Sequence, residues 1–178
     1  MSSPKTLKLI MSALMAAMTC IATMVISVPT PTNGYIHLGD GLVLLSGIIL
    51  GPVYGGMAAG IGSMFSDILL GYAYYALPTF ILKAIAAIAG GYIYQQFTKI
   101  KLSKSYLFPL IGAGITGGII VTCGYFLVEA TVFGYGIAAA SSIPGNLLQN
   151  LFGIVVSALL MPTLSHVPAI RSLMTHSA

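Results

Sequence analysis

Charged side chains are scarce in this chain of 178 residues. Lysine, arginine, aspartate and glutamate together make up 6% of it, and 57% of the residues are hydrophobic, whereas about a quarter of a soluble domain is charged. Because so few charges cannot cover a water-facing surface, we interpret the chain as an integral membrane protein. Its length suits a single membrane domain over residues 1–178 and leaves no room for a separate soluble domain.

Acidic residues and cysteines are fewer still, and both shortages exclude functions. The chain has three acidic and seven basic residues. No basic cluster with interleaved aromatic residues indicates a nucleic-acid partner, so we interpret the excess of basic residues as a signal of membrane orientation. Cys20 and Cys123 both lie in apolar runs, without CxxC spacing or neighbouring histidines. We therefore interpret them as small buried hydrophobes and expect no metal and no cofactor.

Catalytic and nucleotide-binding motifs are also missing. The segment "GGMAAGIGS" has the glycines of a phosphate-binding loop but lacks the GK[ST] ending, so the chain cannot hydrolyse ATP by itself. No HExxH motif occurs, and no histidine lies in a predicted span to activate Ser63. An intramembrane enzyme and a channel or structural membrane protein remain the alternatives to a binding protein. A channel is disfavoured because the polar residues occupy one layer instead of a continuous pore.

Long apolar runs predict an all-α bundle of six transmembrane helices. The first run is about as long as a membrane span and longer than the core of a signal peptide. A single helix over 38–71 would be about 50 Å long, too long for the bilayer core, so we expect a break at "LGPVYGG", where Pro52 favours it. The predicted spans are 6–28, 38–51, 52–71, 76–97, 106–130 and 139–165.

The distribution of basic residues predicts the orientation. With six spans, every basic residue outside the spans falls on the same side, which the positive-inside rule makes the cytoplasm. Both termini are then cytoplasmic, and the outer loops near 29–37, 72–75 and 131–138 contain no lysine or arginine. The residues concerned are Lys5, Lys8, Lys99, Lys101, Lys104 and Arg171.

Small residues four apart predict close helix packing. Ala13 and Ala17 form an AxxxA pattern, and GxxxG patterns begin at Gly56 and Gly114. Each pattern lets a neighbouring backbone approach closely, either within the bundle or in a contact with another protein.

Polar residues within the predicted spans gather in one outer layer. A charge at bilayer depth costs about 2.5–3.5 kcal/mol on insertion scales, so a layer of several charges calls for mutual pairing, a ligand or both. Pairing alone, for example of Lys83 with Asp67, is one interpretation, and a polar ligand pocket is the favoured one. Tyrosines at this depth either form an interface belt or wall the pocket. The candidate pocket residues are Tyr35, His37, Asp40, Asp67, Tyr74, Tyr75, Lys83, Glu129, Asn146, Gln149 and Asn150.

The start of the second predicted span is expected to form the entrance of this pocket. "GYIHLGDG" carries His37 and Asp40 where the chain drops back into the membrane, so we expect these two residues to be the lid and rim of a pocket open to the outside. The pocket layer holds three acids against Lys83, which favours a neutral or cationic ring over an anion. Tyrosines would stack on the ring, while Asn146, Gln149 and Asn150 would bond its hydroxyl or amine groups.

The whole chain resembles an S-component of an energy-coupling factor (ECF) vitamin transporter. The resemblance rests on "LIMSALMAAMTCIATMVISVPTP", on "GYIHLGDGLVLLSGIILGPVYGGMAAGIGSMFSDILLGY", its most specific part, and on "PTFILKAIAAIAGGYIY". It implies a multi-pass subunit of a prokaryotic cell membrane that binds a vitamin on the outer side and joins a membrane coupling protein and two ATPases.

The resemblance also implies roles for two segments. Ala13 and Ala17 would contact the coupling protein, and the loop from about Pro29 to Leu38 would cover the vitamin. The nearest relatives are the pyridoxine, hydroxymethylpyrimidine and pantothenate group. The charge of the pocket ranks the first two above pantothenate, and Lys83 either contacts the ligand or only pairs with an acid.

Overall fold

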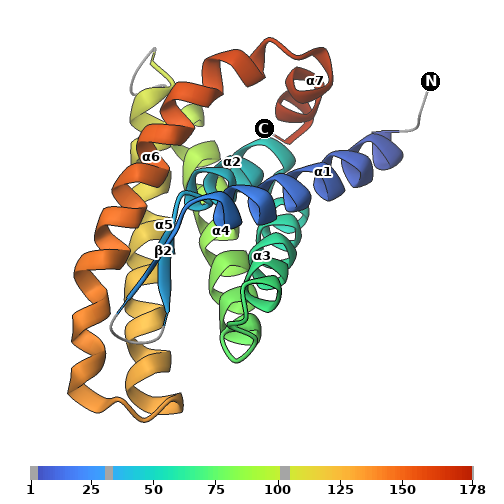
Figure 1. The fold of residues 1–178 in the computed structure, drawn as a ribbon. Coiled ribbons are helices and arrows are strands. Elements are labelled where there is room, and N and C mark those ends of the chain that lie inside the picture. The colour runs from blue at the N-terminus through green and yellow to red at the C-terminus, as the bar shows by residue number, and fades with distance from the viewer. Residues whose placement is uncertain (1–3, 31–33, 101–104, 178) are drawn as a thin grey trace.

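The structure is a computed structural model that describes residues 4–30, 34–100 and 105–177. These residues form seven α-helices and one two-stranded hairpin, and Figure 1 shows how they are arranged. The elements are α1 (Pro4–Val25), β1 (Ser27–Pro29), β2 (Tyr35–His37), α2 (Asp40–Leu50), α3 (Pro52–Leu69), α4 (Ala76–Lys99), α5 (Leu107–Leu127), the π-helical turn η1 (Val128–Val132), the 3-10 helix η2 (Gly136–Ser142), α6 (Ile143–Ser165) and α7 (Pro168–Ser177).

The two ends of the bundle differ in what they carry. The α3–α4 and α5–α6 connections lie at one end, toward which the hairpin extends, and the described ends of the chain lie toward the other (Figure 1). We call these the hairpin end and the terminal end. This arrangement agrees with the expected clustering of outer loops, whereas the cytoplasmic location of the termini remains a prediction. Lys101 and Lys104, on which that prediction partly rests, lie outside the described residues.

Helix α2 occupies the centre of the bundle and is shorter than the roughly 30 Å hydrocarbon core of a membrane. All 11 of its residues are buried, and at 1.5 Å per residue it is about 16 Å long. It ends at Gly51, which has φ +81°, and Pro52 begins α3 directly afterwards. The predicted break is therefore confirmed, and its cause is a left-handed glycine followed by a residue that favours the first turn of a helix.

A short amphipathic helix, α7, supports α2 at the terminal end. Ile170 and Leu173 of α7 are buried in the core cluster that includes Leu50 at the end of α2. Helix α7 was not predicted from the sequence, because a ten-residue segment that begins with Pro168 and mixes apolar with polar side chains gives no membrane-span signal.

Among the described residues, four helical stretches are long and apolar enough to cross a membrane by length and composition. They are Lys5–Val25, Ala76–Lys99, Leu107–Val132 and Gly136–Ser165. Helices α2 and α3 lie where the second and third spans were expected. The chain is thus an all-helical bundle with several membrane-spanning helices, and the count of six spans remains a prediction.

The glycine pairs pack inside the molecule. A side chain at Gly56 or Gly60 would meet atoms of α4, and one at Gly114 or Gly118 would meet atoms of α6. Both GxxxG patterns therefore serve close helix contacts within the bundle. Ala13 and Ala17 differ, because both are exposed on α1.

We predict that Gly47→Ala on α2 destabilises the bundle by about 1–3 kcal/mol, as overpacking does. A Cβ atom there would lie 2.1 Å from the backbone oxygen of Ala87 on α4, and neither backbone can give way without separating the two helices. The matched control is Gly117→Ala on α5, whose Cβ would meet its nearest neighbour, the backbone oxygen of Ala86, at 3.5 Å. Thermal unfolding of the purified variants in detergent measures both changes, and equal melting temperatures would contradict the prediction.

Candidate functional site

A β-hairpin forms the lid of the candidate site. Strands β1 and β2 pair antiparallel, with Ser27 opposite His37 and Pro29 opposite Tyr35. The backbone N–H of Thr30 donates to the oxygen of Gly34 at 2.9 Å and closes the turn. The sequence predicted a loop here, because two strands of three residues are too short to show an alternating pattern.

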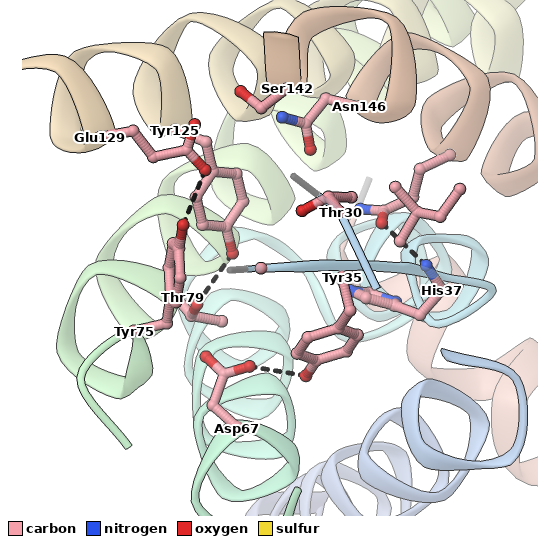
Figure 2. A pocket seen from close by; sticks show the side chains of 13 residues that line it. Thr30, Tyr35, His37, Asp67, Tyr75, Thr79, Tyr125, Glu129, Ser142 and Asn146 are labelled. Atoms are coloured by element: carbon pink, nitrogen blue, oxygen red, sulfur yellow. Dashed lines mark hydrogen bonds between the residues drawn. The ribbon is translucent and has the colours of Figure 1, made fainter. Parts of the chain in front are cut away.

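Beneath the hairpin lies a small polar cavity, which we call the inner cavity (Figure 2). Its volume is about 30 Å³, and the hairpin, α3, α4, α5, η1 and α6 all contribute to its walls. The lining residues are Thr30, Gly34, Tyr35, Ile36, His37, Asp67, Tyr75, Thr79, Tyr125, Glu129, Ser142, Asn146 and Gln149.

Tyr35 and Asp67 join the hairpin to α3. The Tyr35 hydroxyl donates to Asp67 Oδ1 at 2.6 Å, and burial together with the Asp67 charge raises the pKa of Tyr35, which keeps the phenol protonated. Asp67 Oδ2 is buried and has no hydrogen-bond partner among the described residues. A buried carboxylate oxygen without a donor is costly, so this atom can receive a donor group from a ligand.

A second carboxylate faces the inner cavity from the opposite wall. The Tyr75 hydroxyl donates to Glu129 Oε1 at 2.8 Å, and Glu129 lies in the π-helical turn η1. Such turns insert an extra residue into a helix and occur frequently at functional sites. Between the two carboxylates, the hydroxyls of Thr79 and Tyr125 lie 2.8 Å apart (Figure 2).

Gln149 is fixed at both ends by groups of the protein. Its Oε1 accepts from the backbone N–H of His37 at 2.9 Å, and its Nε2 donates to Asp40 Oδ2 at 2.8 Å. A backbone N–H only donates and a carboxylate accepts, so the orientation of the amide is determined. Gln149 therefore ties β2 to α2 and cannot exchange either bond for a ligand without releasing one of them.

His37 is a neutral donor at the lid. Burial, reinforced by the Lys83 charge, lowers the pKa of His37 to about 3. Its Nδ1 accepts from the backbone N–H of Gly39 at 3.0 Å, so the proton of the neutral ring is on Nε2.

Lys83 is engaged below the inner cavity. Its Nζ lies 2.5 Å from Asp40 Oδ1, and its side chain is fully buried. Lys83 Nζ also lies 5.5 Å from the ring centroid of Tyr125. Tyr125 lines the inner cavity, whereas Lys83 does not. The pairing of Lys83 with Asp67 considered from the sequence was wrong, because Lys83 pairs with Asp40. The expectation that Asp40 forms the rim was also wrong, since Asp40 is buried and does not line the inner cavity.

The structure brings most of the predicted site residues together. Seven of them line the inner cavity: Tyr35, His37, Asp67, Tyr75, Glu129, Asn146 and Gln149. Asp40 and Asn150 line a separate cavity of about 20 Å³, Tyr74 lines a groove at the hairpin end, and Lys83 borders none of these three spaces.

Asn150 is also committed within the protein, because its Nδ2 donates to the oxygen of Gly118 and to Thr122 Oγ1, both at 3.1 Å. Thr79, Tyr125 and Ser142 also line the inner cavity but were not predicted from the sequence, and only their proximity to predicted residues could have indicated them. Thr30, Gly34 and Ile36 belong to the loop that was expected to cover the vitamin.

The arrangement is suited to holding a small polar molecule. Within the described residues no group of three or more histidines, cysteines or acids could hold a metal ion. The cavity instead offers donors and acceptors at its walls and aromatic rings around them. Fold and site together define a helical membrane protein with a candidate binding site beneath a hairpin at one end.

Comparison with known proteins shows the family to which this chain belongs. The family model of the ECF-type riboflavin transporter, S component, matches residues 3–166, and the chain belongs to that family. It is therefore the substrate-binding subunit of an ECF importer. The resemblance to ECF S-components is confirmed, and this family consists of transporter subunits and is not known as one of enzymes. The matching model does not confirm the pyridoxine, hydroxymethylpyrimidine and pantothenate group.

Two further proteins are similar to this chain. A solved structure described as the S component of a bacterial ECF transporter has a TM-score of 0.69 and 21% identity, and the match covers 90% of this chain and 96% of that one. It shows the same fold. An uncharacterised protein of Pyrococcus woesei, from the gap 3′ region, is 30% identical over 137 residues, which are 76% of this chain and 86% of the relative.

Proposed function

We propose that this subunit captures a neutral or cationic ring-bearing vitamin of the pyridoxine or hydroxymethylpyrimidine type in the inner cavity. The observation that carries the proposal is the engagement of Lys83 with Asp40, neither of which lines the inner cavity. The cavity walls are left with Asp67 and Glu129, so a carboxylate ligand such as pantothenate would meet two acids and no accessible lysine.

The donors and acceptors of the cavity favour a ring with hydroxyl or amine substituents. Asp67 Oδ2 accepts, while the Nε2–H of His37 and the amide of Asn146 can donate. Tyr35, Tyr75 and Tyr125 provide aromatic faces and edges for a flat ring. Riboflavin is the second candidate, because the family model carries its name and its ring system is also neutral. The inner cavity of about 30 Å³ must widen to admit either ligand, and a single ring requires a smaller movement of the hairpin than a tricyclic one, so we rank the single-ring vitamins first.

Equilibrium binding to the purified protein tests the proposal. Pyridoxine, the hydroxymethylpyrimidine, riboflavin and pantothenate are compared under identical conditions, and one of the first two is expected to bind most tightly with a stoichiometry of one. Tightest binding of riboflavin would overturn the single-ring preference but keep the charge argument. Binding of pantothenate alone would overturn the charge argument itself.

We predict that Asp67→Asn weakens binding of the preferred vitamin by about 10- to 100-fold, the range of a hydrogen bond to a charged group. Asparagine keeps an acceptor for the Tyr35 hydroxyl but replaces the second carboxylate oxygen with an NH2 group, which cannot receive a donor. Isothermal titration calorimetry measures the change, and Cys123→Ser on the exposed face of α5 is the control. Unchanged affinity in Asp67→Asn would remove this carboxylate from the site.

We also propose how the subunit sits in its membrane and what completes the importer. The chain forms a single membrane domain of six spans in a prokaryotic cell membrane, with cytoplasmic termini and the hairpin end facing outward. The exposed AxxxA pattern of α1 contacts a membrane coupling protein, which works with two ATPases. The basic residues at the terminal end and the exposure of Ala13 and Ala17 support this arrangement.

We predict that the chain alone binds vitamin but does not accumulate it. The sequence contains no nucleotide-binding motif, and family members are subunits of an ATP-driven importer. Proteoliposomes that hold only this chain are supplied with an ion gradient, and uptake is expected at background level. Concentrative uptake under these conditions would show that the chain is a secondary transporter.

A further inference from the structure

An open groove lies at the hairpin end, outside the inner cavity. Tyr72, Tyr74 and Tyr135 line it together with Gly71, and the hairpin residues Thr30 and Gly34 form its other side. We call it the tyrosine groove. Thr30 and Gly34 also line the inner cavity, so the hairpin is the partition between the two spaces.

The volumes of the two spaces differ by more than tenfold. The tyrosine groove measures about 460 Å³, within the roughly 300–1,000 Å³ that small-molecule sites commonly have. The inner cavity measures about 30 Å³, room for only about two water molecules. A ring compound therefore fits the groove with the hairpin in its present position, but it enters the inner cavity only when the hairpin moves.

A chain of aromatic contacts connects the groove with the inner cavity. The ring centroids of Tyr72 and Tyr35 lie 4.7 Å apart, and those of Tyr72 and Tyr74 lie 6.4 Å apart. Tyr35 in turn donates to Asp67 inside the cavity. Tyr74 is 48% exposed, so part of its ring faces the groove and can stack on a flat ligand.

We propose that the tyrosine groove is an encounter site, at which the aromatic ring of the vitamin stacks before the hairpin opens and admits it to the inner cavity. This inference rests on the proposed function, because it takes a ring-bearing ligand as given. Binding then has two steps, a rapid association in the groove followed by a slower movement of the hairpin.

Stopped-flow measurements with the full-length protein and pyridoxine test the inference, using the fluorescence of pyridoxine itself. The observed rate is expected to level off as the concentration rises, since movement of the hairpin becomes limiting. Tyr74→Leu and Tyr135→Leu are each expected to raise the half-saturating concentration roughly three- to tenfold, the range of one aromatic contact. The plateau rate and the dissociation rate are expected to stay the same.

Two further variants make the result specific. Tyr74→Phe keeps the ring and is expected to behave like the unmodified protein. Tyr92→Leu removes a tyrosine that is 55% exposed on α4 and borders neither space, and it is expected to change nothing. If Tyr74→Leu does not fold, Tyr135→Leu gives the same reading.

The outcomes separate this inference from the proposed function. Unchanged association rates in both leucine variants, or a change confined to dissociation, would overturn the encounter site while vitamin binding stands. If pyridoxine does not bind, the same series is run with riboflavin. If no ring vitamin binds at equilibrium, the proposed function fails, and the encounter site fails with it.

Discussion

Lys83→Met is expected to lower the free energy of unfolding by about 3–5 kcal/mol, the usual cost of removing one partner of a buried ion pair. Asp40 would remain buried in the centre of the bundle with a charge, and among the described residues Gln149 would be its only remaining side-chain donor. Thermal unfolding in detergent, followed by circular dichroism, measures the loss. Lys99→Met at the exposed end of α4 is the control, and it should change stability by no more than about 0.5 kcal/mol.

The double variant Asp40→Asn/Lys83→Met is expected to regain most of that stability. Asparagine is neutral and still accepts from Gln149 Nε2, and methionine fills the space of the lysine stem without a charge. A double variant no more stable than Lys83→Met would show that the ion pair itself, and not the cost of an unpaired charge, holds α2 to α4. Binding of the vitamin by the double variant is expected to persist, because neither side chain borders the inner cavity.

Ala13→Trp and Ala17→Trp are each expected to reduce vitamin uptake by cells to background while affinity for the vitamin changes by less than about threefold. Both alanines are exposed on α1, and the inner cavity contains no residue of α1. A large ring at either position would keep a partner helix from the close approach that small residues allow. Uptake by cells that express the complete importer and binding to the purified variants are the two measurements.

The control for these variants places the same bulk on another face. Ile119→Trp on α5, where the isoleucine is 59% exposed, is expected to leave uptake unchanged. Normal assembly of Ala13→Trp and Ala17→Trp with the coupling protein would remove α1 from the docking surface. A joint loss of expression and vitamin binding would instead indicate that the alanines stabilise the bundle.

The sequence was sufficient to predict the class of fold, because a helix that crosses the bilayer needs a long run of apolar residues. Apolar runs located the helices to within a few residues, and Pro52 marked the break between α2 and α3. The hairpin and α7 were not predicted, because the membrane imposes no such constraint on short segments. Their short segments gain stability from tertiary contacts, such as the burial of Ile170 and Leu173, and carry little pattern of their own.

At the candidate site, residue types alone did not predict which side chains contact one another. Three acids were expected at the depth of Lys83, but only the rotation of each helix about its axis decides which of them the lysine meets, and it meets Asp40. Gln149 was expected to bond a ligand, yet both ends of its amide are used within the protein. The sequence thus predicted which residues form the polar layer. The three-dimensional structure was needed to tell the residues that bond within the protein from those that are available to a ligand.

The complete burial of α2 has a consequence for how the protein is made. A helix of about 16 Å cannot satisfy a hydrocarbon layer of about 30 Å by itself, and its ends would expose backbone groups to lipid. It becomes stable only when α3 and α4 flank it and the residues of α7 cover its terminal end. Helix α7 follows α1 to α6 in the chain, so the core around α2 is completed only after these helices have been synthesised. A ten-residue helix made after the others therefore closes the structure around a helix that was made early.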